Sequence, residues 1–138
     1  MSELILDHFQ IVRIAKILVA VFLAILFVQS GGDKLIHWKE NKEYFKNQFK
    51  GTFLIRFVTM ALAKLAFLEL SAGLLCFAGS ILLVFEASSQ IALWGYILSA
   101  VSFLALLFGQ RCAKDYAGAA VLPGYFLISV AGIVLYLL

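Results

Sequence analysis

The chain has 138 residues, of which 64% are hydrophobic and only 14% are charged, and its formal net charge is +3. A soluble domain of this size carries about 45–50% apolar and about 25% charged residues, so the composition excludes a water-soluble protein and predicts one small membrane domain, residues 1–138. The basic residues crowd between two apolar segments, which indicates contact with the lipid bilayer and not with nucleic acid.

The first apolar segment predicts a membrane-spanning helix at residues 11–30. Its uninterrupted apolar run, residues 17–28, is shorter than the roughly 20 residues that a bilayer crossing needs. The predicted helix therefore includes the preceding turn, which carries Arg13 and Lys16.

Residues 34–53 form the only long polar stretch. Within it, aromatic side chains recur at spacings of seven, four and four, with lysines and glutamates between them: Trp38, Phe45, Phe49 and Phe53. This pattern is typical of an amphipathic helix, and beside a membrane it favours a short helix lying in the interface. A lysine-rich loop is the alternative.

Three further apolar segments follow at residues 54–85, 91–108 and 116–138, separated by short polar turns. In lipid, only helices and closed barrels satisfy their backbone polar groups, and these segments lack two-residue alternation. The sequence therefore predicts an all-α membrane protein, a bundle of four transmembrane helices. Pro123 predicts a kink in the fourth helix.

The distribution of lysine and arginine predicts the orientation. Arg13 and Lys16 lie at the end that carries both termini, whereas eight basic residues lie at the other end: Lys34, Lys39, Lys42, Lys46, Lys50, Arg56, Arg111 and Lys114. The positive-inside rule places the lysine-rich end in the cytoplasm and both termini outside. Arg13 and Lys16 argue for the opposite orientation.

Glu69 is the most informative polar residue, because it lies about 20 Å along the second helix from Arg56. An unpaired charge in hydrocarbon costs at least about 2.5 kcal/mol, so Glu69 must be paired, protonated or in a wet cavity. With Lys34 and Arg56 at one level, Lys16 lies about 7 Å from Glu69, and Arg13 one turn further. If the predicted pair is functional, it binds a polar ligand or relays a proton. If it is structural, it is an ion pair that fixes the register of the two helices.

Other polar residues are secondary candidates for a ligand site. Lys64 lies about 140° around the helix from Glu69, and either joins the site or extends to the interface. Gln29, Asp33 and Lys34 close the first helix, and Arg111 follows the third. These residues either converge on an anionic ligand or act as anchors and caps.

Short motifs resemble the DoxX-like family of small bacterial membrane proteins. Arg13 followed by Gly31-Gly32-Asp33-Lys34-Leu35 resembles the family's Arg…GxxKL pattern. Glu69-Leu70-Ser71-Ala72-Gly73, followed by Gly79, resembles its ExxxG…G segment. With the four-helix profile, the resemblance covers nearly the whole chain.

The resemblance implies a bacterial inner-membrane protein linked to quinone or sulfur-compound redox chemistry, since the family is named after a small subunit of a thiosulfate:quinone oxidoreductase. The chain lacks the paired cysteines of some relatives. Two hypotheses follow. One is a redox accessory subunit that binds a quinone or small acid near Glu69 and Lys16. The other is a non-catalytic structural or assembly subunit that packs on a larger membrane complex or on itself.

Overall fold

The structure is a computed structural model that describes residues 6–138, and every regular element in this range is a helix. Four helical segments are long and apolar enough to cross a membrane: His8–Ile36, Phe53–Val84, Gln90–Cys112 and Tyr116–Leu137. This confirms an all-α chain with four candidate spans, as expected of a multi-pass membrane protein. Residues 1–5 of the predicted domain lie outside the described part.

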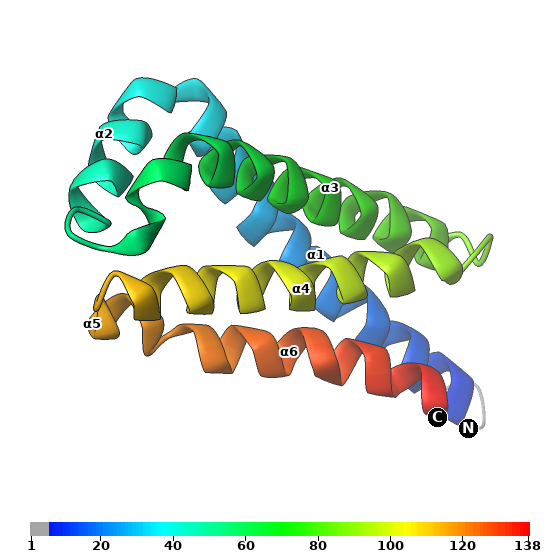
Figure 1. Cartoon of the computed structure of the whole chain (residues 1–138). Coiled ribbons are helices and arrows are strands. Elements are labelled where there is room, and N and C mark those ends of the chain that lie inside the picture. The colour runs from blue at the N-terminus through cyan, green and yellow to red at the C-terminus, as the bar shows by residue number, and fades with distance from the viewer. Residues whose placement is uncertain (1–5) are drawn as a thin grey trace.

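The helix α1 (His8–Ile36) crosses the others obliquely, whereas α3 (Val58–Val84), α4 (Gln90–Cys112) and α6 (Leu122–Val134) run alongside one another (Figure 1). One end of the bundle carries both termini and the α3–α4 turn, and the other end carries α2 and α5. His8 Nε2 lies 2.9 Å from the carbonyl oxygen of Leu138, which joins the two ends of the described chain.

The helix α1 is longer than the predicted 11–30 at both ends. Asp7 caps its start through a reciprocal pair of hydrogen bonds, in which Gln10 N donates to Asp7 Oδ1 and Asp7 N donates to Gln10 Oε1. At the other end the helix continues to Ile36. As a result, the polar helix α2 spans only Trp38–Gln48, within the predicted 34–53.

The later spans also differ from prediction in their ends. A tight 3₁₀ turn, η2 (Phe53–Phe57), leads into α3, and α4 runs one turn beyond the predicted 108. The fourth span divides into α5 (Tyr116–Ala119), α6 and a final turn, η3 (Leu135–Leu137). Pro123 does not kink a continuous helix. It lies in the first turn of α6, where its missing N–H leaves no hydrogen bond unmade.

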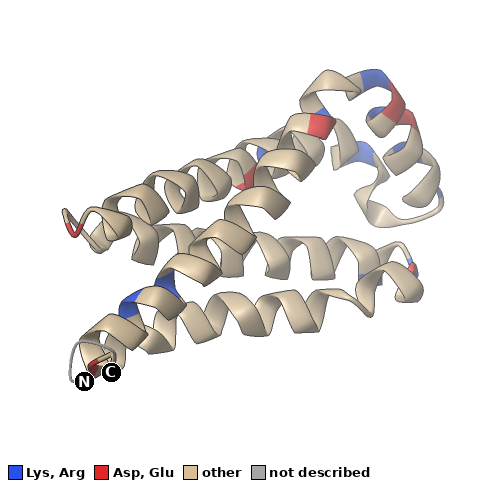
Figure 2. Cartoon of the chain, turned by 180° about the vertical axis from the view of Figure 1, so that it is seen from behind, with Lys and Arg blue, Asp and Glu red and all other residues tan. Residues whose placement is uncertain are grey.

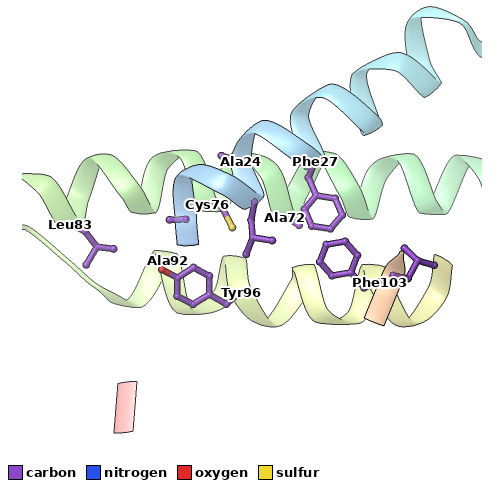
Figure 3. Packing of buried hydrophobic residues seen from close by; sticks show 11 residues of the cluster. Ala24, Phe27, Ala72, Cys76, Leu83, Ala92, Tyr96 and Phe103 are labelled. Carbon is purple, nitrogen blue, oxygen red and sulfur yellow. The ribbon is translucent and has the colours of Figure 1, made fainter. Parts of the chain in front are cut away.

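Small residues and aromatic rings build the core between α1, α3 and α4 (Figure 3). A Cβ atom on Gly73 would lie 2.9 Å from the backbone nitrogen of Val28, and one on Gly79 would lie 2.6 Å from that of Ala92. The helix backbones therefore touch at these points. The Phe27 ring meets the Phe103 ring at a centroid distance of 4.7 Å.

Lys, Arg, Asp and Glu lie mainly at the α2 end of the chain, and few of them lie along the bundle (Figure 2). Large apolar side chains point outward along every span, including Leu18, Phe67, Leu104 and Leu127, each more than half exposed. Such a surface suits contact with lipid and not with water.

Candidate functional site

A buried ionic cluster joins α1 to α3. Lys34 Nζ lies 3.0 Å from Glu69 Oε2, and Ser30 Oγ donates to the same oxygen at 2.9 Å. Lys34 Nζ also donates to Ser30 Oγ at 2.9 Å. Glu69 is fully buried, and the Lys34 side chain is 10% exposed. We refer to these three residues as the Ser30–Lys34–Glu69 cluster.

The positions of the cluster follow from helix geometry. Ser30 and Lys34 are four residues apart on α1 and share one face, whereas Glu69 lies near the middle of α3. Between them, Gly31 lets the helices approach, since a Cβ there would lie 3.1 Å from the Leu70 backbone nitrogen. The last turn of α1 therefore meets the middle of α3.

The prediction that Glu69 pairs with Lys16 or Arg13 is wrong. Both cations lie at the opposite end of the bundle, where Arg13 forms an ion pair with Glu86 and Lys16 Nζ lies 3.7 Å from the centroid of the Tyr136 ring. The prediction assumed that Lys34, at the end of the first helix, and Arg56, at the start of the second, lie at the same height along the bundle axis.

The structure shows why that assumption fails. Residues 37–57 do not form a simple loop, because they fold as α2 and η2 beside the start of α3. The helix α3 therefore extends well beyond the end of α1. Lys34 meets α3 at Glu69, about 20 Å along the axis from Arg56.

One oxygen of the carboxylate has no partner. Glu69 Oε1 is buried and accepts no hydrogen bond from any of residues 6–138. Nearly all buried polar atoms in folded proteins are hydrogen-bonded, and an unpartnered carboxylate oxygen is costly. Oε1 is therefore an unused hydrogen-bond acceptor in the interior of the bundle.

An apolar pocket of about 250 Å³ lies between α2, η2, α3 and α4. Its walls include four aromatic rings: Phe45, Phe49, Phe57 and Phe108. Two amide side chains, Gln48 and Gln110, are its main polar groups. A mostly apolar cavity with a few polar groups is the usual form of a site for a small organic molecule.

The pocket and the cluster share one face of α3. The wall contributed by α3 consists of Val58, Ala61, Leu62 and Leu65, which recur at helical spacing. Glu69 continues this face by one turn, about 6 Å beyond Leu65. The Ser30–Lys34–Glu69 cluster therefore lies next to the end of the pocket, without lining it.

The other predicted site residues lie apart from the cluster. Lys64 and Gln29 are exposed on their helices. Asp33 is exposed and bonds to His37 Nδ1 at 3.0 Å, and the Arg111 guanidinium lies 4.6 Å from the centroid of the Tyr116 ring. Gln29, Asp33, Lys34 and Arg111 were the candidates at the ends of the first and third helices. Among them, only Lys34 contacts Glu69.

Sequence reasoning missed Ser30 and the pocket. Ser30 lies four residues before Lys34, so both residues lie on one face of α1. This spacing is the signal in the sequence that could have identified Ser30 as a second partner of Glu69. The pocket had no comparable pattern, because its walls come from four elements whose packing only the fold defines.

The two segments that carry the family resemblance, residues 31–35 and 69–73, pack on each other through the Lys34–Glu69 pair and the contact of Gly31 with Leu70. Comparison with protein-family models, curated proteins and solved structures finds no match to the chain. The resemblance to DoxX-like proteins therefore stays a prediction from short motifs.

Proposed function

We propose that this protein is an accessory subunit of a redox system in the membrane, and that it holds a quinone-type molecule and is not itself an enzyme. The aromatic pocket carries the proposal. A quinone ring is flat and apolar with carbonyl acceptors at its edge, which suits walls of phenylalanine rings and the amide donors of Gln48 and Gln110. A quinone supplies reversible electron transfer when it is bound.

The cluster adds a polar end to this proposed site. Glu69 Oε1 is the unpartnered acceptor one turn beyond the pocket wall, and Lys34 with Ser30 holds the other carboxylate oxygen in place. In the proposal, Glu69 Oε1 accepts a hydrogen bond or a proton from a hydroxyl of the reduced, quinol form of the bound molecule. A role in thiol chemistry fits less well, because Cys76 is buried in the core and Cys112 lies at the end of α4.

For the location we propose a bacterial inner membrane with α2 in the cytoplasmic interface and both termini outside. The excess of lysine and arginine at the α2 end supports this orientation. The rings of Phe45 on α2 and of Phe49, which follows the helix, line the pocket, whereas Lys39 and Lys46 are exposed. This division suits a helix that lies along the membrane surface.

Two alanines of α3 provide a matched test of the pocket. Ala61 and Ala63 are both exposed on the helix, but only Ala61 lines the pocket. We expect a short-chain benzoquinone to bind the wild type and Ala63→Phe in detergent, and to bind Ala61→Phe at least tenfold more weakly, because the new ring fills the cavity. Equilibrium dialysis measures the three affinities. Equal binding by the two variants, or no binding by the wild type, would contradict the proposal.

Glu69→Gln tests the polar end, since it keeps the shape of the side chain and removes its charge. If Glu69 contacts the bound molecule, Glu69→Gln lowers the affinity for the corresponding short-chain benzoquinol, whose hydroxyl is the donor, even though the pocket walls are unchanged. If it does not, the affinity equals that of the wild type and the cluster has only a structural role.

A structural or assembly role is the second candidate function, and the fourth span favours it. Only 17% of the most apolar stretch of this span is buried, against 39% of the corresponding stretches of Phe53–Val84 and Gln90–Cys112. Its exposed face includes the small residues Ala117, Ala120, Gly124 and Ala131. Small residues allow a second helix to approach closely. In this case Gly124→Phe prevents co-purification of a larger complex from native membranes and leaves quinone binding intact.

A further inference from the structure

A second cavity, of about 430 Å³, lies at the end of the bundle opposite α2. Arg13 and Lys16 of α1 form one wall, and Glu86, Ser88 and Ser89 of the α3–α4 turn form the other. Unlike the aromatic pocket, this cavity has a lining that is about half polar, with Leu83 and Ala87 among its apolar residues.

The charged side chains that line this cavity have a net charge of about +1, since they are Arg13, Lys16 and Glu86. Arg13 pairs with Glu86, but a guanidinium carries five N–H donors, so this contact leaves other donors available. Lys16 Nζ lies over the Tyr136 ring, which attracts the ammonium group without neutralising it. Two cations thus line the cavity with a single carboxylate.

Two tyrosines hold the walls of the cavity in place. The Tyr96 hydroxyl donates to the carbonyl oxygen of Lys16, and the Tyr136 hydroxyl donates to that of Ser89. The Ser88 Oγ accepts a hydrogen bond from Gln90 N, so its own O–H remains a donor. The cations and the serine hydroxyl are therefore presented by a fixed framework.

The cavity lies at the end of the bundle where the candidate spans end, so in a bilayer it would lie at the level of the lipid head groups. Exposed apolar side chains, including Ile14 and Leu18 of α1 and Val84 of α3, continue from it along the bundle. Arginine binds phosphate through paired N–H donors, and lysine binds it as a point charge. We propose that this cavity binds a phosphate group, either that of an anionic phospholipid or a free phosphate ion.

The test replaces Lys16 and uses a second lysine as its control. Lys16→Met removes the charge and keeps an apolar stem over the Tyr136 ring, whereas Lys64→Met removes an exposed lysine of α3 that does not line the cavity. Lys16→Arg restores the charge. The probes are dioleoylphosphatidylglycerol, dioleoylglycerol, which has the same chains and no phosphate, and inorganic phosphate.

For a lipid ligand, native mass spectrometry shows dioleoylphosphatidylglycerol bound about fivefold more weakly to Lys16→Met than to the wild type, Lys16→Arg and Lys64→Met. Dioleoylglycerol binds all four proteins equally weakly. For a free ion, inorganic phosphate raises the Tm of the wild type and not that of Lys16→Met. If Lys16→Met and Lys64→Met behave alike with every probe, or if dioleoylglycerol binds as well as the phospholipid, the proposal is wrong.

Discussion

Lys34 Nζ lies 3.0 Å from Glu69 Oε2 and ties the last turn of α1 to the middle of α3. Both side chains are taken from water, so the attraction between them is largely offset by their desolvation. The pair therefore adds little net stability compared with an apolar contact. Its main structural consequence is the register of α1 against α3, because any shift along the axis would leave both charges buried and unpaired.

Removing one member of this pair is expected to be more costly than removing both. Glu69→Leu leaves the Lys34 ammonium buried without its carboxylate, which costs about 3–5 kcal/mol in soluble proteins. We expect a clear fall in Tm in detergent for Glu69→Leu and for Lys34→Met. The double variant is expected to recover most of the loss. A Glu69→Leu protein that melts with the wild type would show that the pair is not formed.

Gly73 and Gly124 are expected to respond oppositely to alanine. At Gly73, the new methyl would lie 2.9 Å from the Val28 backbone nitrogen, so Gly73→Ala forces α1 away from α3 at a cost of about 1–3 kcal/mol. At Gly124 no neighbouring atom lies within 4 Å. Gly124→Ala is therefore expected to stabilise α6 by up to about 1 kcal/mol. Thermal unfolding of both variants measures the difference, and the same sign for both would refute the packing described.

Lys114 offers a stabilising substitution. It follows the C-cap of α4 with φ 61°, a left-handed conformation that glycine adopts without strain. We expect Lys114→Gly to raise the stability by about 1 kcal/mol, whereas Lys114→Ala keeps the strained conformation and gives no gain. Equal Tm values for the two variants would show that this conformation is not strained.

The orientation can be tested by labelling. Single cysteines at Lys42 and Ser88, in a background without Cys76 and Cys112, lie at opposite ends of the bundle. An impermeant maleimide applied to intact cells is expected to label position 88 and not 42, because the basic α2 end faces the cytoplasm in our proposal. Labelling of position 42 alone would reverse the orientation.

The sequence by itself determined that the chain folds into helices and how many of them are long enough to span. Long apolar segments in lipid must satisfy their own backbone, and only local hydrogen bonding within each segment does so. The sequence did not determine the residues at which the helices begin and end. The polar residues 31–36 continue α1, because Gly31 packs on α3 and Lys34 finds a buried partner.

Only the tertiary structure decided which charges meet. The position of Glu69 along the axis of α1 depends on how residues 37–57 fold. The sequence of this lysine-rich segment is compatible with a loop and with a helix. Because α2 and η2 lie beside α3, Glu69 meets Lys34, while Lys16 and Arg13 line a separate cavity at the far end. Charge pairing across helices depends on a register of a few ångströms, and helix periodicity within one segment carries no information about it.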